Sequence, residues 1–204
     1  SHTVVDGLHF HTTPNAPDSG NDVDILQVGA VFVATGADHV TIRNSEFEDA
    51  PIGINFLGQN GLITGNDLHD TSRFLSYPDW GQLGVVLGNA FIEVSYNHCE
   101  NYIAVGGNYG GDGGFLEVDD RYYGNTAHTL SIHHNTSVGN MGFLEVEGQI
   151  TGQHIDVAYN FSEDEQEFIF FWGGRDSRVE NNTVIRTRPS MNGAVNTVFT
   201  MRQT

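Results

Sequence analysis

Two glutamates stand in repeated apolar surroundings, and a pair of carboxylates can do chemistry. The residues Phe-Leu-Glu-Val occur in GGFLEVDD at 113–120 and again in GFLEVEG at 142–148, which places Glu117 and Glu145 at equivalent positions. If the two segments are neighbouring strands in register, the two side chains lie about 5 Å apart. Like charges directly opposite each other are destabilising, so the pair needs a shared proton, a bound cation or abundant solvent.

A carboxylate pair at this spacing suits acid–base or nucleophilic chemistry on a sugar. Retaining glycosidases hold their two carboxyl groups about 5–5.5 Å apart, and inverting ones about 6.5–9.5 Å apart. Two carboxyl groups this close keep one of them protonated, which supplies an acid. Asp119, Asp120 and Glu147 follow immediately, so the pair could include one of them, with Asp119 as the first substitute. The alternative is that both glutamates merely occupy an exposed column, where such a pair costs less than about 1 kcal/mol.

Aromatic and arginine residues gather in the segments around these acids. Aromatic rings offer apolar faces to sugar rings, and arginine holds a carboxylate or sulfate through two parallel hydrogen bonds. The candidate substrate-binding residues are Arg73, Tyr77, Trp80, Tyr109, Asp120, Arg121 and Tyr122. The same aromatic residues could instead pack under long loops, and Arg121 could simply form an ion pair with Asp120.

A histidine and an acidic loop are the remaining chemical candidates. In SIHHN, strand alternation sends only one of His133 and His134 outward, and the alignment of repeats selects His133 as a candidate base. The segment PDSGNDVD at 17–24 places Asp18, Asp22 and Asp24 in one short loop. An oxygen-rich loop of this kind is what Ca²⁺ requires, although an acidic chain also produces such runs by chance.

Short alternating strands that end on asparagine must position these residues. Each of the segments HVTIRN, GLITGN, FIEVSYN, LSIHHN, HIDVAYN and SRVENN closes on such an asparagine: Asn44, Asn66, Asn97, Asn135, Asn160 and Asn182. A second strand precedes most of them and a third follows some of them, with the shortest repeats 22 residues long. Several short strands per repeat indicate a solenoid, in which stacked coils share one core and the asparagines form a structural ladder at a corner.

Alignment of the repeats predicts which residues stack on one another. One column of the predicted solenoid contains Asn55, Val86, Glu117, Glu145 and Phe170. Within each Phe-Leu-Glu-Val segment, Leu and Val should face the core, while Phe and Glu should face outward. The longest insertions lie at 71–82 and on both sides of the first Phe-Leu-Glu-Val segment, so functional loops are expected over this sheet.

These strand-plus-asparagine units resemble the right-handed parallel β-helix proteins of the pectate-lyase-like superfamily, over about residues 28–187. The resemblance implies an all-β, single-stranded parallel β-helix with loop insertions, forming one domain over 1–204 that could be a segment of a longer chain. It also implies a carbohydrate-active protein, because the superfamily contains lyases, hydrolases, epimerases and adhesins. Relatives bind Ca²⁺, so Asp112, Glu117, Asp119, Glu145 and Glu147 could instead be calcium ligands. Fold alone does not select among these activities.

Charge excludes some partners and one mechanism. The chain has 26 Asp and Glu against 8 Lys and Arg, for a formal net charge of −18, and it contains no lysine. Such a surface repels nucleic acid and anionic membranes, and it fits a secreted, extracellular protein. No signal peptide is recognisable in this chain. A lysine base is excluded, and the single cysteine, Cys99, forms no internal disulfide.

The leading hypothesis is a secreted glycoside hydrolase acting on a polysaccharide or oligosaccharide, with Glu117 and Glu145 as catalytic residues and no required cofactor. The alternative enzyme is a lyase or epimerase on an acidic polysaccharide, with His133, a tyrosine or Arg121 as base. The third hypothesis is a non-catalytic carbohydrate-binding or adhesive β-helix. A further chain or an oligomer could cover the open ends of the solenoid.

Overall fold

The computed structural model describes residues 2–13, 28–71, 82–103, 113–119, 127–147, 153–172, 175–186 and 198–201. All regular structure in these residues is β-strand, arranged as three parallel sheets that we call A, B and C. The predicted single-stranded parallel β-helix is therefore confirmed. The described residues contain no helix long and apolar enough to cross a membrane.

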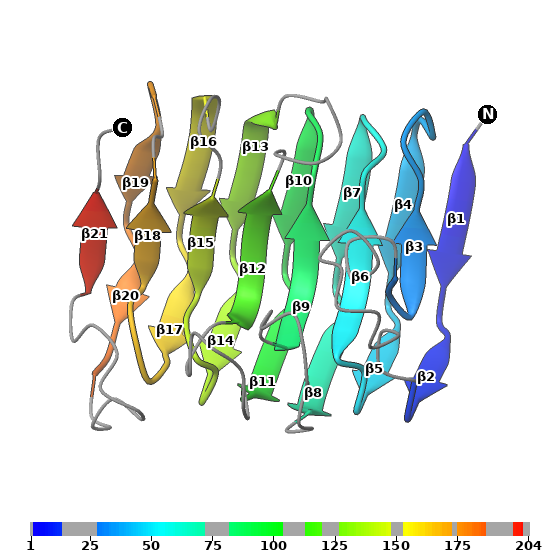
Figure 1. The fold of residues 1–204 in the computed structure, drawn as a ribbon, viewed down its shortest axis with the longest axis horizontal. Helices are drawn as coiled ribbons and strands as arrows, with labels where there is room; N and C mark the ends of the chain where they lie inside the picture. The colour runs from blue at the N-terminus through cyan, green and yellow to red at the C-terminus, as the bar shows by residue number, and fades with distance from the viewer. Residues whose placement is uncertain are drawn as a thin grey trace, which may run out of the picture.

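Each sheet takes one strand from each successive coil (Figure 1). The strands of sheet A are β1 (Thr3–Asp6), β4 (Val40–Arg43), β7 (Gly61–Thr64), β10 (Ile92–Ser95), β13 (His128–His133), β16 (Gln153–Ala158) and β19 (Arg178–Glu180). The strands of sheet B are β2 (His9–His11), β5 (Glu46–Glu48), β8 (Asp67–Thr71), β11 (His98–Tyr102), β14 (Thr136–Val138), β17 (Phe161–Glu163) and β20 (Thr183–Val184). The strands of sheet C are β3 (Val31–Val33), β6 (Ile52–Phe56), β9 (Gln82–Leu87), β12 (Gly113–Asp119), β15 (Leu144–Glu147), β18 (Ile169–Phe171) and β21 (Phe199–Met201).

The coils stack along the longest axis of the molecule, so β1 and β21 lie at opposite ends (Figure 1). Stacking in register places equivalent residues of successive coils directly beside one another. The column predicted from the repeats is confirmed, since the pairing runs from Asn55 through Val86, Glu117 and Glu145 to Phe170. Each coil therefore fixes the lateral position of the residues in the next.

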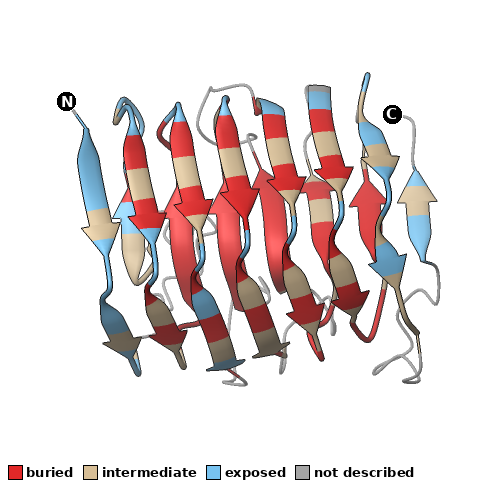
Figure 2. Cartoon of the chain, turned by 180° about the vertical axis from the view of Figure 1, so that it is seen from behind, coloured by how far each residue is buried: buried red, intermediate tan, exposed pale blue. Residues whose placement is uncertain are grey.

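Aliphatic columns inside the solenoid supply the core. In sheet A the paired residues Ile42, Ile63, Val94, Ile132 and Val157 are all fully buried. Burying each such side chain contributes about 1.5–3 kcal/mol, and β-branched residues suit the pleated strand. Sheets A and B alternate buried and partly exposed residues, whereas most of sheet C is buried on both faces (Figure 2). The outer face of sheet C is therefore largely shielded from solvent, unlike the outer faces of sheets A and B.

An asparagine ladder joins the coils at the corner between sheets A and B. The Asn97 side-chain oxygen accepts hydrogen bonds from the backbone N–H and the side-chain amide of Asn66, at 3.0 and 2.9 Å. The Asn97 amide also donates to the carbonyl of Ile63 at 3.0 Å. Asn135, Asn160 and Asn182 repeat this pattern in later coils. The ladder thus satisfies backbone groups that the corner would otherwise leave buried without partners.

The first member predicted for the ladder is wrong by one residue. Asn44 is exposed at φ 50°, and its side-chain amide donates to Asp6 at 2.9 Å. Ser45 holds the ladder position, since its backbone N–H donates to the Asn66 side-chain oxygen at 3.1 Å. A residue with a left-handed backbone conformation precedes the ladder residue in each of these coils. Asparagine suits both positions, because it tolerates the left-handed conformation and its side chain can also form the hydrogen bonds of the ladder. Two asparagine-compatible positions therefore lie side by side.

Removal of one rung should destabilise the solenoid. In Asn97→Ala, the Asn66 N–H and the Ile63 carbonyl lose buried partners, and each such loss costs about 1–3 kcal/mol. We expect the free energy of unfolding in urea to fall by at least about 2 kcal/mol. Asn44→Gly keeps the left-handed corner without entering the ladder, so it should change stability by much less. Equal losses in the two variants would contradict the assignment of the ladder.

Candidate functional site

Four carboxylates form a two-by-two block on the face of sheet C that points away from the core. The pairing sets Glu117 beside Glu145 and Asp119 beside Glu147. Glu117 is 4% exposed and Asp119 is 0% exposed, while Glu145 and Glu147 are half-buried. We call these four residues the carboxylate block. Its two rows lie one coil apart, about 4.8 Å.

Strand alternation explains the block, because Leu116, Val118, Leu144 and Val146 belong to the core. The expectation that the phenylalanines face outward with the glutamates is wrong. Phe115 and Phe143 are fully buried in the core and contact each other with ring centroids 5.6 Å apart. In both segments the phenylalanine and the following leucine belong to the core, so strict alternation does not extend back to the phenylalanine.

Two glycines allow the close approach of the coils where β12 begins. Gly113 and Gly114 have φ angles of 114° and 137°, which residues other than glycine rarely adopt. A Cβ on Gly114 would lie 2.4 Å from the carbonyl oxygen and 2.8 Å from the nitrogen of Gly142 in the next coil. The glycine pair therefore sets where β12 enters the sheet and, with it, where Glu117 lies.

Burial decides among the three ways in which the paired acids could be tolerated. Abundant solvent is available only to an exposed pair, and Glu117 and Asp119 are both buried. Charged groups in such surroundings are usually paired, protonated or bound to a cation. The alternative of an exposed, solvated column therefore does not hold for Glu117, and a shared proton, a bound cation or a neighbouring partner group remains.

A cation fits one part of the block. Glu117, Asp119 and Glu147 each offer an oxygen within 4.8 Å of the others. Oxygens bind Ca²⁺ at about 2.3–2.6 Å, so two ligands on opposite sides of the ion lie at most about 5 Å apart. Glu145 is not part of this triad, although it stacks directly on Glu117. These three residues would hold a calcium ion if one binds.

The next coil places aromatic rings beside the block: the predicted column neighbour Phe170 and also Trp172, which the sequence analysis missed. Phe170 pairs with Glu145, and Trp172 donates its backbone N–H to Val146 at 3.0 Å. The two rings lie 5.4 Å apart, and Trp172 is half-buried. The signal in the sequence was the spacing of Phe170 and Trp172, which matches that of Glu145 and Glu147.

A small cavity adjoins Glu145. Its volume is about 20 Å³, and Glu145, Gly113, Gly142, Gln166 and Glu167 line part of it. A water molecule needs at least about 10–15 Å³ on this measure. The cavity can therefore accommodate one water molecule next to the half-buried glutamate.

His133 lies on a different sheet from the carboxylate block. It is the last residue of β13 in sheet A, with Ser95 and Ala158 as its predicted column neighbours, and its Nε2 lies 3.4 Å from Glu93. His134 is also exposed, contrary to expectation, because it occupies a left-handed corner at φ 55°. The structure thus does not bring His133 together with Glu117.

Several candidates lie outside the described residues. These are the substrate-binding candidates Arg73, Tyr77, Trp80, Tyr109, Asp120, Arg121 and Tyr122, and the acidic candidates Asp18, Asp22, Asp24 and Asp112.

The outer face of sheet B carries a second group of ionisable side chains that the sequence analysis missed. Two adjacent columns of the first four coils contain histidines and acids: His9, Glu46, Asp67 and His98 in one, and His11, Glu48, His69 and Glu100 in the other. We call these eight residues the histidine–acid face. The strand sequences HFH, EFE, DLH and HCE carried the signal, since polar residues flank one apolar residue that packs in or against the core in each.

His69 is the least exposed of the histidines that form ion pairs on this face. Its Nε2 lies 3.2 Å from Glu46 and its Nδ1 lies 3.1 Å from Asp70. Partial burial lowers the pKa of His69, but hydrogen bonds with Asp70 and Glu46 outweigh burial, so the net pKa lies above its ordinary value. Hydrogen bonds from Asn101 and then from His69 hold the pKa of Asp70 below its ordinary value.

No protein-family model, curated protein or solved structure matches this chain.

Substitution at Gly114 should disturb the block from a distance. In Gly114→Ala the new Cβ would overlap the backbone of Gly142, which cannot move without separating two coils. We expect a loss of at least about 2 kcal/mol in the free energy of unfolding. Gly36→Ala is the matched control, since Gly36 also has a positive φ, 88°, but has open space around it. A Gly114 variant no less stable than the Gly36 variant would refute this role.

His69 should contribute stability that depends on pH. Its folded-state pKa is raised, so its contribution is fully present below the unfolded value of about 6.5 and is lost as the pH rises through the folded value. We therefore expect His69→Gln to reduce the urea midpoint more at about pH 5 than at about pH 8. His154→Asn, at an exposed corner, is the control. A difference that grows with pH would show that the ion pairs are misassigned.

Proposed function

We propose that this protein is a secreted glycoside hydrolase whose catalytic acids belong to the carboxylate block. The observation that carries the proposal is the stacking of Glu117 on Glu145, with Phe170 and Trp172 on the next coil. Buried carboxylates beside aromatic rings suit a sugar, because the rings bind the apolar face of the sugar and the acids act on the glycosidic bond. The site would accept an oligosaccharide or a polysaccharide chain.

Burial divides the roles between the two glutamates. Glu117, 4% exposed, is the better general acid, since a buried carboxyl group is more readily kept protonated. Glu145 is half-buried and lines the small cavity, so it suits attack on the anomeric carbon and then activation of water. The spacing of adjacent coils, about 4.8 Å, is close to the 5–5.5 Å of retaining enzymes. Asp119 is the alternative acid.

The chemistry then balances in two steps. Glu117 protonates the glycosidic oxygen while the carboxylate of Glu145 forms a bond to the anomeric carbon, which releases the first product. Glu117, now ionised, takes a proton from a water molecule that displaces Glu145 from the sugar. The anomeric configuration is retained.

One observation favours a lyase or epimerase as the second candidate. Glu117, Asp119 and Glu147 could bind Ca²⁺, and a cation there would hold the carboxylate group of an acidic polysaccharide. His133 lies on sheet A, so the base in this mechanism would be Arg121 or a tyrosine outside the described residues. The acids would then act as metal ligands.

Product chemistry separates the two candidates. We expect a panel of neutral and acidic polysaccharides to yield reducing ends without new ultraviolet absorbance, in calcium and in chelator alike. Glu117→Gln and Glu145→Gln should each lower kcat by at least about a hundredfold, since each removes a proton-transfer or nucleophilic step. Glu180→Gln, an exposed ion-pair substitution on sheet A, should leave kcat unchanged.

Two results would overturn the hydrolase. Ultraviolet-absorbing products that disappear with chelator would make the acids calcium ligands and the enzyme a lyase. Full activity in both glutamine variants would remove the carboxylate block from catalysis altogether.

A further inference from the structure

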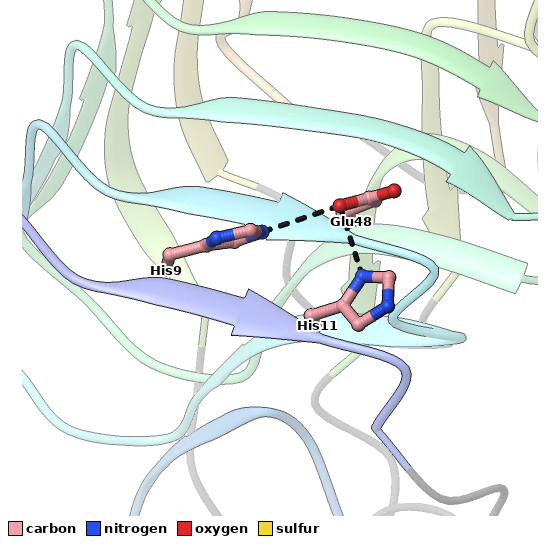
Figure 3. Close-up of side chains that lie close together, drawn as sticks. All are labelled: His9, His11 and Glu48. Atoms are coloured by element: carbon pink, nitrogen blue, oxygen red, sulfur yellow. Dashed lines mark hydrogen bonds and ion pairs between the residues drawn. The ribbon is translucent and has the colours of Figure 1, made fainter.

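Two histidines and one glutamate converge on the outer face of sheet B, far from the chemistry proposed for sheet C. His9 and His11 come from β2, and Glu48 comes from β5 in the next coil (Figure 3). Glu48 Oε2 lies 3.3 Å from His9 Nε2 and 2.9 Å from His11 Nδ1. We propose that these three residues form a binding site for a divalent transition-metal ion, with Zn²⁺ as the best match.

The spacing of the three groups suits such an ion. Zinc binds imidazole nitrogen and carboxylate oxygen at about 2.0–2.2 Å, so neighbouring ligands of a tetrahedral ion lie about 3.4 Å apart. The two nitrogen–oxygen distances, 3.3 and 2.9 Å, are both somewhat shorter than this separation, and all three ligand atoms lie within 4.8 Å of one another. Small side-chain rotations would open room for the ion, because both histidines are more than half exposed.

The fold holds the ligands in place through the residue between them. Phe10 and Phe47 stack at 4.8 Å with an angle of 11° between their rings, and both point inward. Strand alternation therefore sends His9 and His11 to the same outer side, and the register sets His11 directly beside Glu48. The ligand set thus bridges the first two coils and needs no loop.

Ligand type selects the kind of metal. Imidazole nitrogen favours zinc and copper, whereas Ca²⁺ and Mg²⁺ favour sites made of oxygen alone. Glu46, whose Oε2 lies 3.9 Å from His9 Nε2, adds negative charge next to the site and supplies a hydrogen-bond acceptor for a bound water molecule. The other oxygen of Glu46 lies 3.2 Å from His69 Nε2, which fixes the glutamate.

The site is accessible from solvent. His9 and Glu46 line an open groove of about 530 Å³, together with Asn44, Ser45 and Asp67. An ion or its water ligands can enter from this groove without unfolding a coil. Two imidazoles that converge on one carboxylate oxygen form a chelating arrangement, whereas an ordinary surface ion pair needs only one of them.

Calorimetric titration with Zn²⁺ tests the proposal directly. Excess calcium chloride is present throughout, so that sites made only of oxygen, including the carboxylate block, are already filled. We expect one zinc ion per chain to bind to the unmodified protein. His9→Gln, His11→Gln and Glu48→Gln should each weaken the affinity at least about tenfold, because each removes one of three ligands.

Matched variants make the result specific. His39→Asn removes another exposed histidine that also pairs with an acid, Asp38 at 2.8 Å, and should leave zinc affinity unchanged. Far-ultraviolet circular dichroism checks that each variant is folded, and the exposure of His9 and His11 predicts that both are. The absence of stoichiometric zinc binding, or equal affinity in the folded ligand variants and the unmodified protein, would overturn the proposal.

Discussion

In-register stacking of coils at the asparagine corner is the constraint on which the other features depend. Three hydrogen bonds connect Asn97 to the preceding coil, and the same pattern recurs at Asn135, Asn160 and Asn182. Because the corner repeats in each of these coils, the strands on either side remain in register. The columns of sheets A, B and C follow from this, as do the carboxylate block and the histidine–acid face.

The sequence predicted the architecture well because its signals are local and repeat in each coil. Alternation and the recurring asparagine gave the three strands of a coil and the column that contains Glu117 and Glu145. The errors arose where one residue type satisfies two positions, as at Asn44 and Ser45, or where two consecutive residues both belong to the core, as Phe115 and Leu116 do. Neither feature changes the strand pattern, so the pattern could not reveal it.

The candidate sites were predicted less completely, because they depend on which side of each sheet is covered. Pairing of Glu117 with Glu145 followed from the repeat, but their burial did not, since the sequence does not show that sheet C is enclosed on both faces. The histidine–acid face was missed for a different reason, the shortness of its strands. Its strands are only a few residues long, and HFH or EFE is too short to stand out until four such strands are placed side by side.

The ladder has a direction. In each successive pair, the backbone N–H and the side-chain amide of the earlier asparagine donate to the oxygen of the later one, from Asn66 through to Asn182. The amide dipoles therefore point the same way and polarise one another along the whole corner. Damage at one rung is correspondingly one-sided. Loss of Asn135 would leave the N–H of Asn97 without its acceptor, whereas the N–H of Asn160 would keep its bond to Asn182.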